Sequence, residues 1–399
     1  MTWPMVQFQE LYSESSRNGV YKPKEFHGTG VKMVKMGELF GYDIINTQEM
    51  NRLSMTDVEM FKSGLQDGDL LFGRRSLVES GAGKCSLVEG LDEPMTFESS
   101  IIRVRVDQNK VRPRFLLYWL KSHQGRGNIK AIVTGTNVKG IKASALSKIN
   151  IAKPPIDVQD KIVGFLRAYD DLIENNKHRI ELLEKVPQLL YKEWFVNLHF
   201  PGHEHTRIVD GVPDGWEEVS FSNIATFMNG YAFKPADLGS VGYPIVKIPE
   251  LRNGPTLKTP RNTGETIPNK YVISNGDLLF SWSGTLLVNI WNHGPALLNQ
   301  HLFKVTPNYP DLRSFVFLAL KNSLSSFYNQ TTGATMKHIR KGALESVTIP
   351  LPSPLLLRQF EDFVSDILQQ ISILEQQITK LKEARDLLLP KLMSGEISV

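Results

Sequence analysis

Residues 134–154 read TGTNVKGIKASALSKINIAKP, and residues 332–352 read TGATMKHIRKGALESVTIPLP. The two stretches are identical at eight aligned positions, which include Ile141 with Ile339 and Leu146 with Leu344. Two further blocks recur in the same order: GDLLF stands at 68–72 and 276–280, and VKMGEL at 34–39 returns as VKIPEL at 246–251. Self-similarity on this scale predicts a tandem repeat of one unit of about 200 residues, and therefore two similar working surfaces.

The first part of each repeat reads as a mixed α/β domain, over about 1–154 and 215–352. Both parts carry short β-rich runs, such as YPIVKI and LFKVT, between clusters of Gly, Pro and Asn. The segments 115–122 and 315–322 read as short buried helices. Because strands and helices do not alternate at regular length, we do not expect a doubly wound sheet.

The second part of each repeat carries the heptad pattern of a coiled coil. The seam of the second copy consists of Phe360, Val364, Ile367, Ile371, Leu374, Ile378, Leu381, Arg385, Leu388 and Leu392. The first copy follows in the same register with Ile162, Leu166, Tyr169, Ile173, Asn176, Ile180, Leu183, Pro187, Leu190 and Trp194. A single heptad seam would favour a helix that packs on its own domain. Two seams in the same register favour two helices that pair with each other as antiparallel rods of about 50 Å.

The fold class predicted from these patterns is α+β. Two mixed α/β domains in tandem repeat are separated by two long helices that form an antiparallel coiled coil. The predicted segments are domain 1 (1–154), the first helix (155–197), a linker (198–214), domain 2 (215–352), and the second helix with the C-terminal tail (353–399). Two seam residues depart from an ideal coil. Asn176, opposite apolar partners, should cost stability but fix the register, and Pro187 should kink or interrupt its helix.

Composition narrows the class of protein. A single cysteine, Cys85, excludes an internal disulfide and a cysteine-based zinc site, and it fits a reducing cytoplasm. We find no run of 18 apolar residues and no signal-peptide pattern at the N-terminus, so we expect a cytoplasmic protein with no membrane partner. The net charge of +4 permits nucleic-acid binding without requiring it.

No catalytic or cofactor-binding constellation is found. GAGKC at 81–85 lacks the first glycine and the final Ser or Thr of a phosphate-binding loop. His199, His203 and His205 lie in the predicted linker, where solvated histidines are a better reading than metal ligands. GxSxG, HExxH and a dinucleotide fingerprint are also missing from the sequence. We therefore expect a protein without catalytic residues, metal or cofactor.

Paired polar loops follow the recurring blocks and are the candidate DNA-binding residues. Arginine forks suit guanine edges and phosphates, asparagine suits adenine, and hydroxyls and lysines suit the backbone. Any single loop could equally be an ordinary solvated turn, but matched placement with different side chains favours two different targets on one scaffold. The candidates are Arg74, Arg75, Ser76, Thr136, Asn137, Lys139 and Lys142 in the first copy, and Ser281, Trp282, Ser283, Thr285, Thr335, Lys337, His338 and Arg340 in the second.

The order of these blocks resembles the specificity (S) subunits of type I restriction-modification enzymes. The resemblance spans essentially the whole chain. It rests on the repeated W..V.F entry (Trp3, Val6 and Phe8; Trp216, Val219 and Phe221), GDLLFSWSGT, TGATMKHI, LLYKEWFVNLHFPGHE and the tail LLLPKLMSGEI. Copy one departs from it where GRRSL replaces SWSGT.

The resemblance implies a non-catalytic subunit with two target-recognition domains, which read a bipartite, asymmetric site in double-stranded DNA. It also implies that the helices dock two methyltransferase (M) subunits, while the assembly of nuclease/translocase (R) subunits stays open. Two alternatives remain: a coiled-coil adaptor that binds proteins only, and a self-contained nuclease or methyltransferase. Salt-dependent duplex binding would separate the first from an S subunit, and activity of the purified chain would reveal the second.

Overall fold

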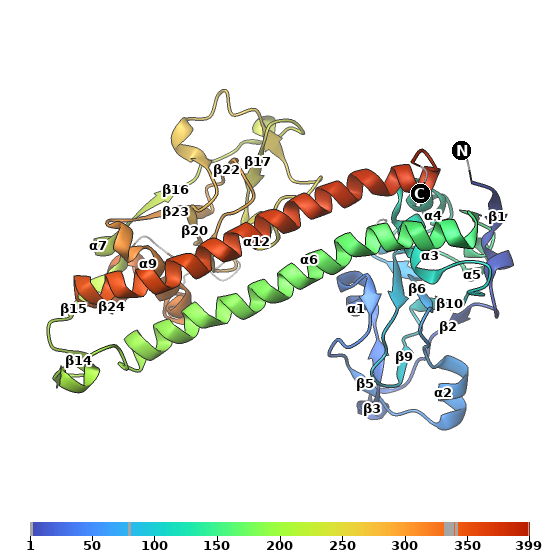
Figure 1. Cartoon of the computed structure of the whole chain (residues 1–399), viewed down its shortest axis with the longest axis horizontal. Helices are drawn as coiled ribbons and strands as arrows, with labels where there is room; N and C mark the ends of the chain where they lie inside the picture. The colour runs from blue at the N-terminus through green and yellow to red at the C-terminus, as the bar shows by residue number, and fades with distance from the viewer. Residues whose placement is uncertain (1–2, 79–80, 331–338, 340–341, 398) are drawn as a thin grey trace. The chain divides into compact units, whose positions relative to one another are not determined.

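The chain folds into two compact units, each with its own hydrophobic core. In this computed structural model, residues 3–78, 81–330, 339, 342–397 and 399 are described. Unit 1 comprises Met1–Asp171 and Lys382–Val399, and unit 2 comprises Leu172–Leu381. The long helices α6 (Ile156–Tyr191) and α12 (Pro354–Ser394) each contribute to both units (Figure 1). The contacts therefore divide the chain differently from the predicted segments, since each unit combines a mixed domain with parts of both helices.

Unit 1 is built on two small sheets. The larger has the order β2 (Arg17–Asn18), β10 (Ile101–Val104), β6 (Leu70–Gly73), β8 (Cys85–Val88) and β4 (Ile44–Ile45). The smaller has the order β5 (Arg52–Leu53), β3 (His27–Val34) and β9 (Met95–Phe97), in which β3 and β9 are parallel. The short helices are α1 (Met36–Gly41), α2 (Asp57–Ser63), α3 (Pro113–Lys121), α4 (His123–Ala131) and α5 (Ala143–Leu146).

Unit 2 repeats this plan. One sheet has the order β16 (Ala225–Asn229), β23 (Leu302–Pro307), β20 (Leu278–Ser281) and β21 (Leu287–Ile290). The other has the order β18 (Arg261–Asn262), β17 (Tyr243–Val246), β22 (Ala296–Leu298) and β19 (Val272–Ile273), with β17 parallel to β22 as β3 is to β9. The short helices are α7 (Phe221–Ile224), α8 (Ile248–Asn253), α9 (Arg313–Asn322), α10 (Leu324–Asn329) and α11 (Ala343–Ser346).

The recurring GDLLF block forms the same turn and central strand in both units. Gly68 and Gly276 adopt φ of 95° and 91°, a left-handed conformation that favours glycine. The next residue, Asp69 or Asp277, accepts a hydrogen bond from the backbone N–H three residues before it, at 2.8 and 2.9 Å respectively. The Leu-Leu-Phe that follows is buried in β6 or β20. GDLLF therefore recurs because the turn requires its glycine and aspartate and the buried strand requires its Leu-Leu-Phe.

Each domain is closed by pairing its first strand with its last. β1 (Met5–Gln7) pairs with β12 (Asn150–Ala152), and β15 (Glu217–Ser220) pairs with β24 (Thr348–Leu351). Val6 lies opposite Ile151 in the first pair, and Val219 lies opposite Ile349 in the second. These are the residues that the sequence alignment matches, so the tandem repeat is confirmed at the level of strand register.

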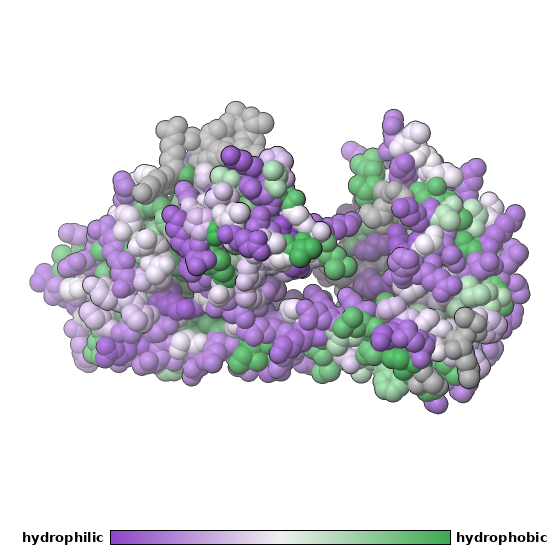
Figure 2. All heavy atoms as spheres, turned by 90° about the horizontal axis from the view of Figure 1, so that it is seen from above, coloured by the Kyte–Doolittle hydropathy of each residue, from purple (hydrophilic) through white to green (hydrophobic). Residues whose placement is uncertain are grey.

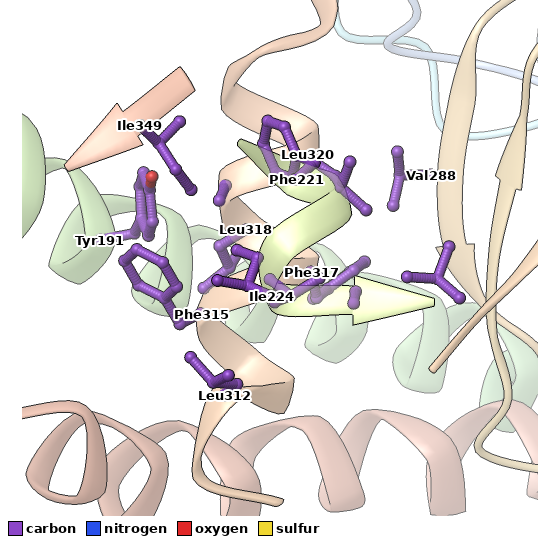
Figure 3. Close-up of a cluster of buried hydrophobic side chains, with 14 of the residues drawn as sticks. Tyr191, Phe221, Ile224, Val288, Leu312, Phe315, Phe317, Leu318, Leu320 and Ile349 are labelled. Carbon is purple, nitrogen blue, oxygen red and sulfur yellow. The ribbon is translucent and has the colours of Figure 1, made fainter. Parts of the chain in front are cut away.

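A buried helix forms the centre of each core, as predicted for 115–122 and 315–322. In unit 2, side chains of α9 pack among residues from α7, β24 and the end of α6 (Figure 3). Phe315 lies 5.8 Å from Tyr191 between ring centroids, and 5.0 Å from Phe195. In unit 1, α3 buries Phe115, Trp119 and their neighbours in the same way. The mixed domains are thus anchored on the long helices through aromatic packing.

The two long helices are antiparallel within each unit. In unit 1, Ile162 and Leu166 from the start of α6 share a core with Leu392 and Met393 from the end of α12. In unit 2, Trp194, in the π-helical turn Lys192–Val196 that follows α6, lies 5.7 Å from Phe360 near the start of α12. The antiparallel coiled coil of the predicted fold class is therefore confirmed.

Two expectations about the seam are wrong in detail. The helix α6 runs through Pro187 without interruption, and Tyr191 and Trp194 beyond it pack in the core of unit 2; a kink at Pro187 stays a prediction. Asn176 does not face apolar partners alone, since its Nδ2 donates to Oε1 of Gln377 at 3.2 Å. The polar seam residue is therefore satisfied by a polar partner on the opposite helix.

Between the repeats, the predicted linker carries a 3₁₀ turn (His203–His205) and a small hairpin of β13 (Ile208–Val209) and β14 (Val212–Pro213). The face drawn in Figure 2 is mostly hydrophilic, with apolar side chains in small groups. Among the described residues, no helix is both long and apolar enough to cross a membrane.

Candidate nucleic-acid interface

In unit 1 the fold joins the two polar loops that the sequence singles out. Strand β7 (Arg75–Ser76) pairs with β11 (Lys139–Gly140), so that Ser76 lies opposite Lys139. The N–H of Ile141 also donates to the carbonyl oxygen of Arg74 at 3.0 Å. The loop after GDLLF and the loop at 134–142 therefore form one continuous surface element.

Unit 2 contains the equivalent bond. The N–H of Ile339 donates to the carbonyl oxygen of Trp282 at 2.9 Å, and Ile339 is buried in the core. In the aligned repeats, Ile339 corresponds to Ile141 and Trp282 to Arg74. The same two segments are thus joined at the same point in both domains, while the side chains beside that point differ.

The joined loops of unit 1 present their polar groups to solvent. Arg75, Thr136, Asn137 and Lys142 are exposed, whereas Arg74 and Lys139 are half-buried. Nζ of Lys139 donates to the carbonyl oxygen of Gly135 at 2.9 Å. Ser76 is the exception, because it is buried and its Oγ accepts the N–H of Val78 at 3.1 Å. Ser76 therefore shapes the loop, while the other six present groups that suit bases and phosphates.

The corresponding loop of unit 2 is folded inward. Ser281 and Ser283 are buried: Oγ of Ser281 donates to the carbonyl oxygen of Thr285 at 2.6 Å, and Oγ of Ser283 lies 2.9 Å from Nδ1 of His301. Nε1 of Trp282 donates to the carbonyl oxygen of Gln300 at 3.0 Å. Only Thr285 of these four predicted residues is exposed. Contact of the two serines with DNA stays a prediction, and it would require this loop to open.

The remaining predicted residues of the second copy are Thr335, Lys337, His338 and Arg340. They lie outside the described residues.

A family model described as the type I restriction modification DNA specificity domain matches residues 35–185 and 213–383. Its two matches cover most of the chain and follow the two repeats. The chain belongs to the specificity subunits of type I restriction-modification systems.

Individual relatives agree with this assignment along nearly the full length. The chain is 24% identical over 391 residues to the type I restriction enzyme MjaIX specificity subunit of Methanocaldococcus jannaschii, covering 95% of this chain and 89% of that protein. It is 22% identical to the HindI specificity subunit of Haemophilus influenzae, covering 84% of this chain and 88% of the relative. The crystal structure of an S subunit from M. genitalium shares the fold, with a TM-score of 0.60 at 16% identity over 98% of this chain and 96% of that one.

The first specificity domain also gathers basic residues that the sequence did not single out. Lys84 and Arg126 lie beside the strand that leads into Arg74, where Nη1 of Arg126 donates to the carbonyl oxygen of Gly83 at 3.3 Å, and the nearby Lys121 pairs with Asp43 at 2.6 Å. Burial lowers the pKa of Lys84, Asp43 opposes this, and the charges of Lys121 and Arg126 lower it further. These residues are far apart in the sequence, so only the fold reveals the cluster. Its positive charge suits a phosphate backbone.

Proposed function

We propose that the two specificity domains of this S subunit each read one half of a bipartite, asymmetric site in double-stranded DNA. The paired bonds Ile141–Arg74 and Ile339–Trp282 carry this proposal, because they place different side chains at the same point of one scaffold. In these loops Arg75 and Thr285 are exposed, and a guanidinium and a hydroxyl recognise different base edges. Two equivalent pairs of joined loops that carry different side chains therefore suit two different half-sites.

Affinity in the first domain is assigned to its basic residues. Arg75 and Lys142 are exposed, and Lys84 and Arg126 extend the positive region. Lysine and arginine contacts to phosphates would make binding strongly salt-dependent. Sequence discrimination is assigned to the loop side chains that reach base edges, of which Arg74, Arg75 and Asn137 have the matching donor geometry.

We also propose that the subunit is non-catalytic and acts in the cytoplasm, where it docks two M subunits on its helical pair. The helices expose apolar side chains, including Leu189 (62% exposed) and Phe363 (65%) in unit 2 and Phe165 (56%) in unit 1. Apolar residues left exposed on a helix pair are typical of a surface that a partner covers. Methyl transfer would belong to those partners, which must flip the target adenine out of the duplex.

The proposal is tested by single-molecule methylome sequencing of cells with and without this gene. A split methylated motif that disappears with the gene supports it, and an unchanged methylome contradicts it. Native mass spectrometry of the coexpressed proteins should give one S chain with two M chains. A protein-only adaptor, which family membership does not favour, would show no salt-dependent duplex binding in the same complex.

A further inference from the structure

Three apolar side chains are exposed together at the end of the β7–β11 pair in the first specificity domain. Leu77 is 84% exposed, Val78 60% and Val138 49%. Leu77 follows Ser76 and Val138 precedes Lys139, the last residues that face each other in the ladder. Leu77 and Val138 are therefore neighbours across the two strands, and Val78 lies beyond them. We refer to these three residues as the apolar tip.

Backbone hydrogen bonds lie on both sides of the apolar tip. The N–H of Val78 donates to Oγ of the buried Ser76 at 3.1 Å, and the N–H of Gly81 donates to the carbonyl oxygen of Val78 at 3.1 Å. Across from this turn, Thr134 and Gly140 exchange backbone hydrogen bonds of 2.9 and 2.8 Å. The exposed side chains are thus presented by hydrogen-bonded turns, which lowers the entropic cost of inserting them into a partner.

Gly135 makes the second of these turns possible. Its φ is 103°, and a Cβ at this position would lie 2.1 Å from the carbonyl oxygen of Val138. Only glycine fits such a close approach. The turn that carries Val138 is therefore specified by the sequence itself.

The surroundings of the apolar tip are basic. Segments 73–78 and 134–142 contain Arg74, Arg75, Lys139 and Lys142 and no acidic residue; Glu79, which follows, lies outside the described residues. Within the part of the chain that the structure describes, the guanidinium groups of Arg74 and Arg75 form no ion pair. Apolar side chains flanked by arginines match duplex DNA, in which stacked bases lie between two phosphate backbones.

We propose that the apolar tip inserts into a base step of the half-site that the first domain reads, unstacks it and bends the duplex there. This inference rests on the proposed function and adds a mode of readout to it: the base step must be one that unstacks easily, so the domain would select flexible steps at a position where it makes no base hydrogen bond.

Among the residues that the structure describes, the second domain has no exposed apolar counterpart of Leu77 and Val78; Met336, which aligns with Val138, lies outside the described residues. In the aligned repeat, Thr285 stands in place of Leu77 and Leu286 in place of Val78. Leu286 is 4% exposed, and its N–H donates to Oη of Tyr328 at 3.0 Å, so it belongs to the core. The distortion is therefore expected in one half of the site only, which gives the proposal an internal control.

The test uses the assembled complex of this chain with its methyltransferase partners and duplexes that carry the methylated motif. 2-Aminopurine, whose fluorescence rises on unstacking, replaces each adenine of the site in turn except the methylated adenines and their direct neighbours, which base flipping would itself unstack. We expect a rise at one step in the half-site of the first domain and none in the other half-site. The variant Leu77→Ser/Val78→Ser should lose that rise and bind about tenfold more weakly, which corresponds to about 1.4 kcal/mol.

Matched variants separate the apolar tip from general surface effects. Phe61→Ser, at a 93% exposed residue of α2, should change neither fluorescence nor affinity. Leu77→Met, which keeps an apolar side chain, should retain the signal. The melting temperature of each variant should equal that of the unmodified protein, because the changed side chains are exposed.

Three outcomes would overturn the inference. If the double serine variant keeps both the fluorescence rise and the affinity, the apolar tip is not inserted. If sequence-specific, salt-dependent binding occurs without a rise at any position, insertion is wrong while the proposed function stands. If the complex shows no sequence-specific binding at all, the proposed function fails and the insertion fails with it.

Discussion

Arg385 of α12 and Asp170 of α6 form an ion pair, in which Nη1 of Arg385 lies 2.7 Å from Oδ1 of Asp170. The other carboxylate oxygen of Asp170 accepts the hydroxyl of Tyr118, on α3, at 2.6 Å. Arg385 occupies a seam position at which the heptad pattern otherwise has apolar residues. One carboxylate therefore links the two long helices of unit 1 to its mixed domain.

Asp170→Asn should lower the free energy of unfolding by about 2 kcal/mol, because it removes the more buried of the two carboxylates that pair with the guanidinium of Arg385 and leaves only Asp386, whose side chain is 63% exposed. Urea denaturation measures the change. Asp171→Asn, at the next residue, is the control, since its ion pair with Arg167 is solvent-exposed and should contribute less than about 1 kcal/mol. A double-mutant cycle with Tyr118→Phe should show coupling between Tyr118 and Asp170. Equal effects of the two aspartate substitutions would contradict the linking role.

Glu375 should make unit 2 less stable as the pH rises from 4.5 toward neutrality. Burial raises the pKa of Glu375 above its ordinary value of 4.5, and the nearby Glu184 raises it further, against opposing effects of Asn292 and Lys321. The folded state therefore holds this proton more tightly than the unfolded state. The stabilisation of the folded state by the proton on Glu375 is fully present below pH 4.5 and is lost as the pH rises through the raised pKa.

Denaturant unfolding between pH 4.5 and 7.5 tests this pH dependence. Glu375→Gln should flatten the decline, because the amide stays neutral and can still accept the hydrogen bond from Nδ2 of Asn292, which is 2.7 Å long. Glu174→Gln, at a side chain that is 76% exposed, should leave the pH dependence as it is in the unmodified protein. A decline of the same steepness in the Glu375→Gln variant would exclude Glu375 as its cause.

Exchanging residues 215–352 for another specificity domain should change one half of the methylated motif and preserve the other half and the gap. The junctions fall just outside β15 and β24, which pair with each other, so the exchanged segment carries its own closing strands. Methylome sequencing of the exchange strain reads out both halves. If both halves change together, the domains do not read DNA independently.

Adding seven residues to each long helix should lengthen the gap between the half-sites by about three base pairs. Seven helical residues add about 10.5 Å, and duplex DNA rises about 3.4 Å per base pair. The added heptads belong after Asp171 and after Leu381, where the two units divide, so that the contacts inside each unit are kept. Insertion after Ser372 is unsuitable, because its Oγ donates to Oδ1 of Asn292 at 2.6 Å.

The half-site bases should stay the same in this variant, since the loops are untouched and seven residues keep the seam in register. Three base pairs also rotate the far half-site by somewhat more than a quarter turn, which is expected to weaken binding. Methylome sequencing measures the new gap. An active variant with an unchanged gap would show that the helices do not set the spacing.

Leu392→Ala should destabilise unit 1 by about 2–4 kcal/mol, because the side chain is 3% exposed and packs in the core of the first domain. Leu387→Ala, on the same helix but 69% exposed, should cost less than about 0.5 kcal/mol. Thermal unfolding of the two variants gives the comparison. Similar melting temperatures would mean that the end of α12 does not stabilise this core.

The repeat and the helices were predictable from sequence because they depend on periodic or recurring residues. Ile141 and Ile339 align, and the bonds from their N–H groups to Arg74 and Trp282 place both loop pairs where the alignment indicates. The burial of Ser281 and Ser283 was not predictable, since it depends on Thr285 and His301 as partners across a folded loop. The pairing of Asn176 with Gln377 likewise depends on how two distant helices are aligned.

The packing of both chain ends in unit 1 also has a consequence for synthesis on the ribosome. Trp3 donates from Nε1 to the carbonyl oxygen of Leu392 at 3.4 Å, and unit 1 is completed by Lys382–Val399. The first domain is therefore completed only when residues 382–399 have been translated, roughly 10 to 40 s after residue 171 at ordinary elongation rates. During that interval the site for Leu392 and Met393 is uncovered, so nascent chains of this protein should need chaperone protection that a split gene supplying residues 382–399 early would relieve.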